Sequence, residues 1–249
     1  MMILMSPTKM MRKKIFTHAT FPYFHQETKK LMDFLKTLSI QDIMDVMKVS
    51  ETIAKQNYER FQSLRISKFG SDALYAYEGL QYKQLSLSTY NDRQIDYANN
   101  HVYILSGLYG VLKANDPIQS YRLEMKCRLA INEKRSLYEF WKEKINRYLQ
   151  EESKKQENCC IINLTSKEYD EVLNDTTKKQ CIQISFKVYK QDILKVVATS
   201  AKMARGAMLS YLIEHEIMSL KQVQAFAQHG FSFDAQLSSK QEFVFVKRD

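Results

Sequence analysis

The sequence predicts a mixed α/β fold (α+β), with a single compact domain over residues 1–249 and a mixed sheet flanked by helices. Short apolar runs of strand length alternate along the chain with segments of helical periodicity. No Pro-, Gly- or Ser-rich stretch, low-complexity run or internal repeat marks a linker. Hydrophobic residues make up 45% of the chain and aromatic residues 12%, which is enough to fill one sizeable core.

The first half of the chain is expected to form two strands and four helices. Apolar runs that lead into polar residues predict strands over residues 2–5 and 102–105. Apolar residues at helical spacing predict helices over residues 26–38, after the capping residue Ser39, from Ser50 onward, and over residues 92–100 after the capping residue Thr89. Residues 73–82 fit a helix and a strand equally well.

The second half alternates strands and helices more regularly. Apolar or alternating runs predict strands over residues 159–164, 181–186, 193–199 and 242–246. Helices are predicted after Ser136 and after Thr165, because each begins a capping-box pattern with a glutamate three residues later. Residues 151–158 have the composition of a charged turn, and residues 200–218 have helical periodicity.

The charge balance favours an anionic partner. The chain has 37 Lys and Arg residues against 28 Asp and Glu residues, for a net charge of +9. Such an excess suits nucleic acid or a phosphorylated small molecule, although many proteins of this charge are basic only for solubility.

Cysteine and histidine usage indicates a cytoplasmic protein without a metal centre. The cysteines lack any C-x-x-C pair and are expected to be reduced core residues: Cys127, Cys159, Cys160 and Cys181. Five histidines are scattered, and neither a phosphate-binding P-loop nor a G-x-G-x-x-G motif occurs, so we expect no metal and no cofactor. No segment has the length and composition of a membrane span or signal peptide, so no membrane association is expected.

The segment from Leu105 to Met125 is the most informative stretch. It holds two of the six glycines, and an apolar run leads into it like a strand that ends in a tight turn. Arg122 and Glu124 are two residues apart, so in an extended segment they point to the same side. The arginine suits a phosphate or carboxylate ligand, and a structural salt bridge that anchors the loop is the alternative.

Two further pairs of polar residues have informative spacing. Ser6 and Lys9 have the S-x-x-K spacing of serine acyl-enzymes, but the S-D-N and K-T-G partner motifs are absent. We therefore expect the end of the first strand to present this hydroxyl and ammonium group to an anion. Lys202 and Arg205 share one face near a helix start, where cations oppose the helix dipole unless an anion also binds.

These motifs, in this order, resemble those of the YaaA peroxide-stress protein family. The matching blocks are Ser6–Lys9, Leu105–Met125, Leu137–Trp141, Asn163–Tyr169, Ala201–Met208, Gly230–Asp234, Ser238 and Glu242–Phe245. Supporting polar and turn residues inside the blocks are Ser106, Gly107, Tyr109, Gly110, Asp116, Tyr121, Asn163, Glu168, Asp234, Ser238 and Glu242. The resemblance implies a mixed fold outside the common superfolds. It also implies a cytosolic peroxide-stress protein that limits free intracellular iron and binds duplex DNA.

The DNA association implied by the family comes with a helix-hairpin-helix element. The segment from Gly107 to Gly110 faintly resembles its hairpin, but the residues before it look like a strand. No such element can be placed with the residues alone.

The sequence leaves open how the chain acts. A DNA-binding module of low sequence specificity should have a long open basic groove, with Ser6, Lys9, Arg122, Lys202 and Arg205 as contacts. An enzyme acting on a nucleotide or an extruded base should instead have a closed pocket that joins the S-P-x-K and Y-R-L-E-M motifs. A third hypothesis is action through protein partners. No catalytic residue and no oligomeric state is indicated.

Overall fold

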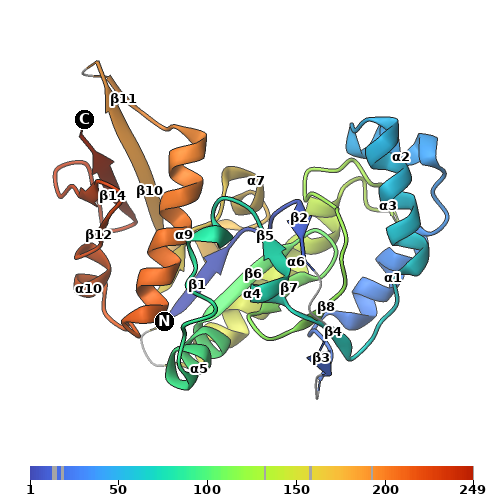
Figure 1. Cartoon of the computed structure of the whole chain (residues 1–249), viewed down its shortest axis with the longest axis horizontal. Coiled ribbons are helices and arrows are strands. Elements are labelled where there is room, and N and C mark those ends of the chain that lie inside the picture. The colour runs from blue at the N-terminus through green and yellow to red at the C-terminus, as the bar shows by residue number, and fades with distance from the viewer. Residues whose placement is uncertain (13–15, 18–19, 132, 157–158, 192, 249) are drawn as a thin grey trace.

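The computed structural model describes residues 1–12, 16–17, 20–131, 133–156, 159–191 and 193–248. Within this part of the chain the largest sheet has nine strands, which run through the left and middle of Figure 1. Its strands follow the order β12 (Ala227–Gln228), β13 (Phe231–Phe233), β14 (Glu242–Lys247), β10 (Cys181–Lys190), β9 (Ile161–Asn163), β1 (Met2–Met5), β6 (Val102–Ser106) and β7 (Gly110–Lys113). β11 (Ile193–Lys195) pairs with β10 outside this order.

The centre of the sheet is parallel and its margins are antiparallel. β1 pairs in parallel with β9 and β6, so that Ile3 lies opposite Ile162 on one side and Val102 on the other. β10 runs parallel to both β9 and β14. β7, β11 and β13 are antiparallel to their neighbours β6, β10 and β14. The predicted mixed sheet is confirmed.

Helices cover both faces of this sheet. In Figure 1, α9 (Ala198–Glu214) and α5 (Asp92–His101) lie in front of the strands, and α6 (Leu137–Lys154) lies behind them. The shorter helices of the same region are α7 (Lys167–Asp170), α8 (Asp175–Gln180) and α10 (Leu220–Gln224). All four residues of β1 are buried, as expected for a parallel strand covered on both faces.

A helical group packs at the other end of the molecule, on the right of Figure 1. It consists of α1 (His25–Leu35), α2 (Ile40–Met47) and α3 (Glu51–Ser63). Small antiparallel pairings connect it to the sheet: β2 (Met10–Met11) with β5 (Tyr77–Glu78), and β4 (Phe69–Asp72) with both β3 (Phe16–Thr17) and β8 (Pro117–Ile118). The region predicted as ambiguous contains both kinds of structure, since α4 (Ala73–Ala76) precedes β5, and the 3-10 helix η1 (Tyr82–Gln84) follows it.

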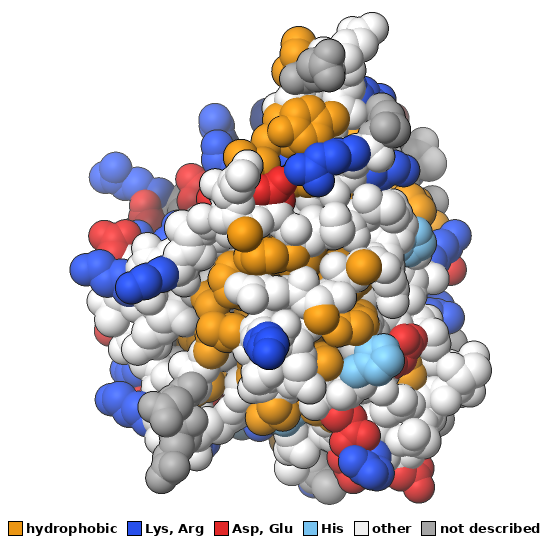
Figure 2. Space-filling view, turned by 90° about the vertical axis from the view of Figure 1, so that its left-hand side faces the viewer, with side chains coloured by type: hydrophobic (Ala, Val, Ile, Leu, Met, Phe, Trp, Pro, Cys, Tyr) orange, Lys and Arg blue, Asp and Glu red, His pale blue; other side chains and the backbone are white. Residues whose placement is uncertain are grey.

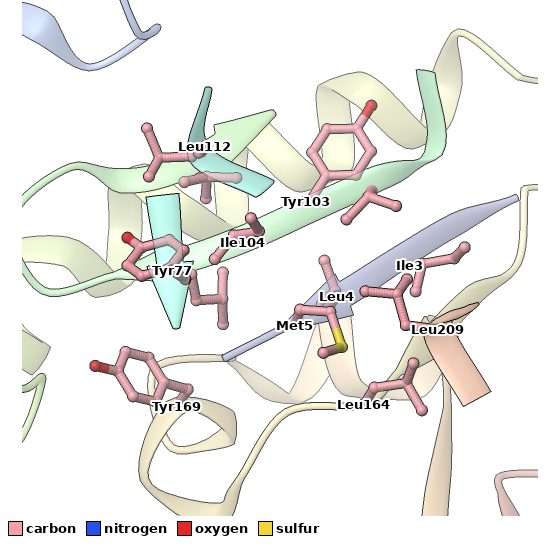
Figure 3. Close-up of a cluster of buried hydrophobic side chains, with 14 of the residues drawn as sticks. Ile3, Leu4, Met5, Tyr77, Tyr103, Ile104, Leu112, Leu164, Tyr169 and Leu209 are labelled. Carbon is pink, nitrogen blue, oxygen red and sulfur yellow. The ribbon is translucent and has the colours of Figure 1, made fainter. Parts of the chain in front are cut away.

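The core forms around β1. Figure 3 shows Ile3 and Leu4 of β1, Ile104 of the neighbouring strand β6, Leu164 and Leu209 of α9 in one cluster of buried side chains. All of these side chains are fully buried. Because this strand is fixed from both faces, the residue that follows it is held in a defined place.

Two of the predicted helix caps are wrong. α5 begins after Asn91, whose side chain accepts the Gln94 N–H at 3.0 Å in a complete capping box, while Thr89 donates its hydroxyl to the Ser86 carbonyl. The predicted Thr165 cap does not form either, because the Thr165 N–H and hydroxyl both donate to the Asn163 side chain. Ser39 and Ser136 do cap their helices, as predicted.

Two predicted boundaries also differ. Residues 151–154 continue α6 instead of forming a charged turn, since Glu152 is buried and accepts hydrogen bonds from Tyr103 and Lys155. Residues 157–158 of that prediction lie outside the described residues. The strand predicted over residues 193–199 ends at Lys195, and α9 starts at Ala198, because four alanines spaced by three favour helix there.

The four cysteines are free, with Cys127 and Cys181 buried and Cys159 and Cys160 partly buried. No helix in the described ranges is long and apolar enough to cross a membrane.

Candidate functional site

A cavity of about 310 Å³ lies where β1 and β9 end. It brings together all six residues predicted to bind a ligand: Ser6, Lys9, Arg122, Glu124, Lys202 and Arg205. Tyr121 and Glu168, from the supporting set, also line it. The location follows from topology, because the loops after the carboxyl ends of parallel strands meet at one edge of the sheet.

Ser6 is fixed at the end of β1 by four hydrogen bonds. Its carbonyl accepts one from the Gln81 side chain at 2.5 Å and one from the Tyr82 hydroxyl at 3.0 Å. Its hydroxyl accepts the Ser166 N–H at 2.8 Å and donates to the Ser166 hydroxyl at 3.3 Å. The hydroxyl is therefore positioned by the loop after β9, and Lys9, the partner that an S-x-x-K acyl-enzyme would need, is engaged elsewhere.

Glu124 is the buried anion of the site, and its side chain is only 8% exposed. Its Oε1 accepts the Lys9 ammonium at 2.7 Å and lies 3.5 Å from the Arg122 guanidinium. Burial opposes the charge of Glu124, but Lys9 and Arg122 outweigh it and lower the pKa of the carboxyl. The Arg122–Glu124 ion pair, which was the alternative to a ligand-binding arginine, is therefore present. Glu124 Oε2 and Arg122 Nε are nevertheless buried without a hydrogen-bond partner in the described part of the chain.

Lys202 and Arg205 line another part of the cavity, called the cationic wall below. They lie on α9, and neither has an acidic partner among the ion pairs of the described residues. Arg205 Nε is also buried without a partner, and burial lowers the pKa of this arginine. A partly buried guanidinium without a counter-ion is costly unless an anion binds beside it.

Gly206 lets α9 approach the rest of the site. A Cβ at this position would lie 1.9 Å from the Gln81 carbonyl oxygen, so only glycine permits the contact. Because Gln81 also bonds the Ser6 carbonyl, this one contact links the cationic wall to the end of β1.

The hairpin turn between β6 and β7 supports the segment that carries Arg122 and Glu124. A Cβ on Gly107 would lie 2.4 Å from the Leu123 carbonyl oxygen, so the turn and this segment touch backbone to backbone. Ser106 accepts the N–H groups of Leu108 and Tyr109 at 3.2 and 2.9 Å. The turn is buried and flanked by strands, so residues 107–110 are not the hairpin of a helix-hairpin-helix element.

Tyr121 lines the cavity, and its hydroxyl belongs to a buried hydrogen-bond network. The Tyr121 hydroxyl shares hydrogen bonds with Ser106 at 2.6 Å and with Tyr77 at 2.7 Å. Burial raises the pKa of Tyr121 to about 12, so this hydroxyl is neutral at physiological pH. Tyr109, in contrast, is not among the residues that line the cavity, and its hydroxyl accepts the Gln119 N–H at 3.1 Å.

Glu168 on α7 is the second carboxyl group of the cavity. Burial and the nearby charge of Glu124 raise the pKa of Glu168, which accepts the Lys126 N–H at 3.4 Å. The pKa values of the two glutamates are therefore shifted in opposite directions, and such pairs are a feature of sites that bind or move protons.

The other predicted residues lie outside the cavity and shape loops. Asp116 accepts the Lys113 N–H at 2.8 Å, Gly110 adopts a φ of 73° in the β6–β7 hairpin, and Asn163 bonds Asp170 at 2.8 Å. The three predicted residues nearest the C-terminus also form hydrogen bonds away from the cavity, which join Asp234 to Arg248, Ser238 to Val244, and Glu242 to Ser185.

Residue-by-residue reasoning missed several lining residues, among them Thr8, Gly79, Gln81, Ser166 and Tyr169. Two signals could have found some of them. Ser166 and Tyr169 lie inside the motif that supplied Asn163 and Glu168, and Gly79 is one of only six glycines. In the described residues no group of three or more His, Cys, Asp and Glu side chains is arranged to hold a metal ion.

Comparison with known proteins gives a match over nearly the whole chain. The sequence model of a family described as peroxide stress protein YaaA matches residues 1–237, which include every residue that lines the cavity. A UPF0246 protein of Clostridioides difficile (strain 630) is 36% identical over 99% of this chain and 100% of its own length. UPF0246 proteins of Crocosphaera subtropica and Bordetella petrii are 37% and 36% identical, over 92% and 100% of this chain and 91% and 100% of their own.

Proposed function

The chain belongs to the YaaA family of peroxide stress proteins, and from this premise we propose that it serves the peroxide stress response by binding a small phosphorylated ligand, such as a nucleotide, in its cavity. One observation carries the proposal. Six polar residues from three separate motifs converge on one cavity, and its two cations on α9 have no acidic partner in the described residues.

The size and lining of the cavity favour a small molecule over a duplex. Small-molecule sites have volumes of roughly 300–1,000 Å³ and combine apolar walls with a few polar groups. The cavity of about 310 Å³ has apolar contributions from Pro7, Leu80, Leu123 and Tyr169. A compact cavity of this size supports the nucleotide hypothesis more than the long groove expected for a DNA-binding module.

Isothermal titration calorimetry with adenosine monophosphate (AMP) and with inorganic phosphate tests the proposal. Charged hydrogen bonds contribute roughly 1.5–3 kcal/mol each, so Lys202→Ala/Arg205→Ala should bind AMP at least about 100-fold more weakly. The matched control is Lys142→Ala/Arg147→Ala, which removes the same two charges from the exposed face of α6. Absence of AMP and phosphate binding to the wild type, or equal loss in both variants, would contradict the proposal.

Duplex DNA is the second candidate partner, and the net charge of +9 favours it. On the face seen in Figure 2, hydrophobic side chains occupy the middle and Lys and Arg side chains are scattered mostly toward the edges, so we place a duplex on another face. Fluorescence anisotropy over a salt series measures this binding. If the cavity cations contact phosphates, Lys202→Ala/Arg205→Ala should reduce the salt slope by about 2, while the α6 control should leave it unchanged.

The cellular function is tested in a strain that lacks this protein. The wild-type chain should restore survival in hydrogen peroxide, and Lys202→Ala/Arg205→Ala should not, at equal protein level. Free intracellular iron, whose lowering the family resemblance implies, is measured in the same cells.

A further inference from the structure

We propose that the cavity selects a phosphorylated ligand that also carries an amino group, and that Glu124 accepts the hydrogen bond of this amino group. The inference rests on the proposed function and names the chemical feature that distinguishes the true ligand from other phosphates. In a nucleotide, the phosphate would occupy the cationic wall and the amino-bearing base would reach Glu124.

The argument begins with the oxygen of Glu124 that has no partner. Oε1 is held by Lys9 and Arg122, but Oε2 is buried without a hydrogen-bond partner in the described part of the chain, and Glu124 lines the cavity. Leaving a buried charged acceptor unsatisfied is costly, and buried carboxylate oxygens are almost always paired. An occupant that donates a hydrogen bond removes this cost, and an occupant that presents only acceptors adds repulsion.

The cationic wall and the Glu124 side of the cavity favour opposite hydrogen-bonding groups in a ligand. α9 presents the exposed Lys202 and the partly buried Arg205, whose unpartnered Nε suits an acceptor such as phosphate. The segment after β8 presents an ionised carboxylate, whose pKa is lowered by Lys9 and Arg122 in spite of burial, and which needs a donor. A ligand that satisfies both sides is therefore an anion with a donor group on another part of the molecule.

The apolar and aromatic part of the lining suits a flat ring. Leu123, Tyr121 and Tyr169 contribute to the same cavity, and aromatic and apolar surfaces are the usual contacts of a nucleobase. Adenine and cytosine carry an exocyclic amino group, while hypoxanthine and uracil carry a carbonyl oxygen at the equivalent position. The two members of each pair therefore differ at the group that would face Glu124, which is a hydrogen-bond donor in one and an acceptor in the other.

The experiment compares AMP with inosine monophosphate (IMP), and cytidine monophosphate with uridine monophosphate, by calorimetry on the wild-type protein. We expect the amino-bearing member of each pair to bind at least about tenfold more tightly, the effect of one hydrogen bond to a charged group. In Glu124→Gln the preference should disappear or invert, because the amide can turn its N–H toward the carbonyl oxygen. Circular dichroism verifies that this variant is folded, and the wild-type comparison decides the question if it is not.

The outcomes separate the two proposals. Equal affinities within both pairs would overturn the amino selection and leave the phosphate site standing. Binding of none of the nucleotides and no phosphate would overturn both. An amino preference that survives unchanged in a folded Glu124→Gln variant would overturn the role of Glu124.

Discussion

Replacing Gly206 with alanine should open the contact between α9 and the end of β1 and weaken the cavity. The added Cβ would lie 1.9 Å from the carbonyl oxygen of Gln81 and 2.6 Å from its carbonyl carbon. Both are backbone atoms, so no flexible side chain can move aside. To reach ordinary van der Waals separation, the helix and the Gln81 segment must part by about 1.5 Å.

Two opposing contributions set the size of the effect. Forced overpacking costs typically about 1–3 kcal/mol, and a clash this close belongs at the upper end. Alanine stabilises a helix interior by about 1 kcal/mol relative to glycine, which offsets part of the cost. The net loss of about 2 kcal/mol should lower the melting temperature by about 4–8 °C in a protein of this size.

Thermal unfolding and AMP calorimetry together test this reasoning. Gln81 and Tyr82 both donate to the Ser6 carbonyl, so their displacement should also weaken AMP binding. Gly230→Ala is the control: its φ of 79° makes alanine strained by about 1–3 kcal/mol, but the residue lies outside the cavity. A Gly206→Ala protein that melts above the wild type, or that binds AMP as tightly as Gly230→Ala does, would refute the proposed contact.

Three further substitutions test the interior of the site. Tyr121→Phe removes a hydroxyl that hydrogen-bonds two other buried hydroxyls, so the free energy of unfolding measured in urea should fall by about 1–3 kcal/mol. An unchanged midpoint of urea unfolding would contradict the network. Lys9 helps to lower the pKa of Glu124, so this pair stabilises the folded protein above pH 4.5, the ordinary glutamate value. As pH falls below 4.5, the free energy of unfolding should therefore drop more steeply in the wild type than in Lys9→Met. Parallel pH curves would argue against the pair. Glu168 has a raised pKa, so its contribution to stability is present at low pH and lost as pH rises above 4.5. Over this pH range Glu168→Gln should gain stability relative to the wild type. A constant difference in stability would show that burial does not shift the pKa of Glu168.

Much of the fold and the cavity follows from local patterns in the sequence. The apolar run before Ser6 predicts a buried strand, and the spacing of two between Arg122 and Glu124 predicts their shared side. Lys202 and Arg205 were identified because two cations near a helix start need an explanation. Ser6 and Glu168 lie in the segments that follow the parallel strands β1 and β9 at one edge of the sheet. α9 and the segment that carries Arg122 are held near them by the close backbone contacts at Gly206 and Gly107.

The remaining features depend on contacts between distant segments. Thr89 and Asn91 are both competent caps, and which of them begins α5 depends on the reciprocal bond from Gln94. Glu152 lies in a charged run that resembles a turn, and its burial depends on Tyr103 of a distant strand. Likewise, Gln81 has no local signature, since its role arises only where α9 touches its backbone.

The most direct test of the central claim is a crystal structure of the protein with AMP bound. The account predicts the phosphate within hydrogen-bond distance of Lys202 and Arg205, and the adenine amino group at Glu124. Density for AMP at another surface, with the cavity filled only by solvent, would contradict it.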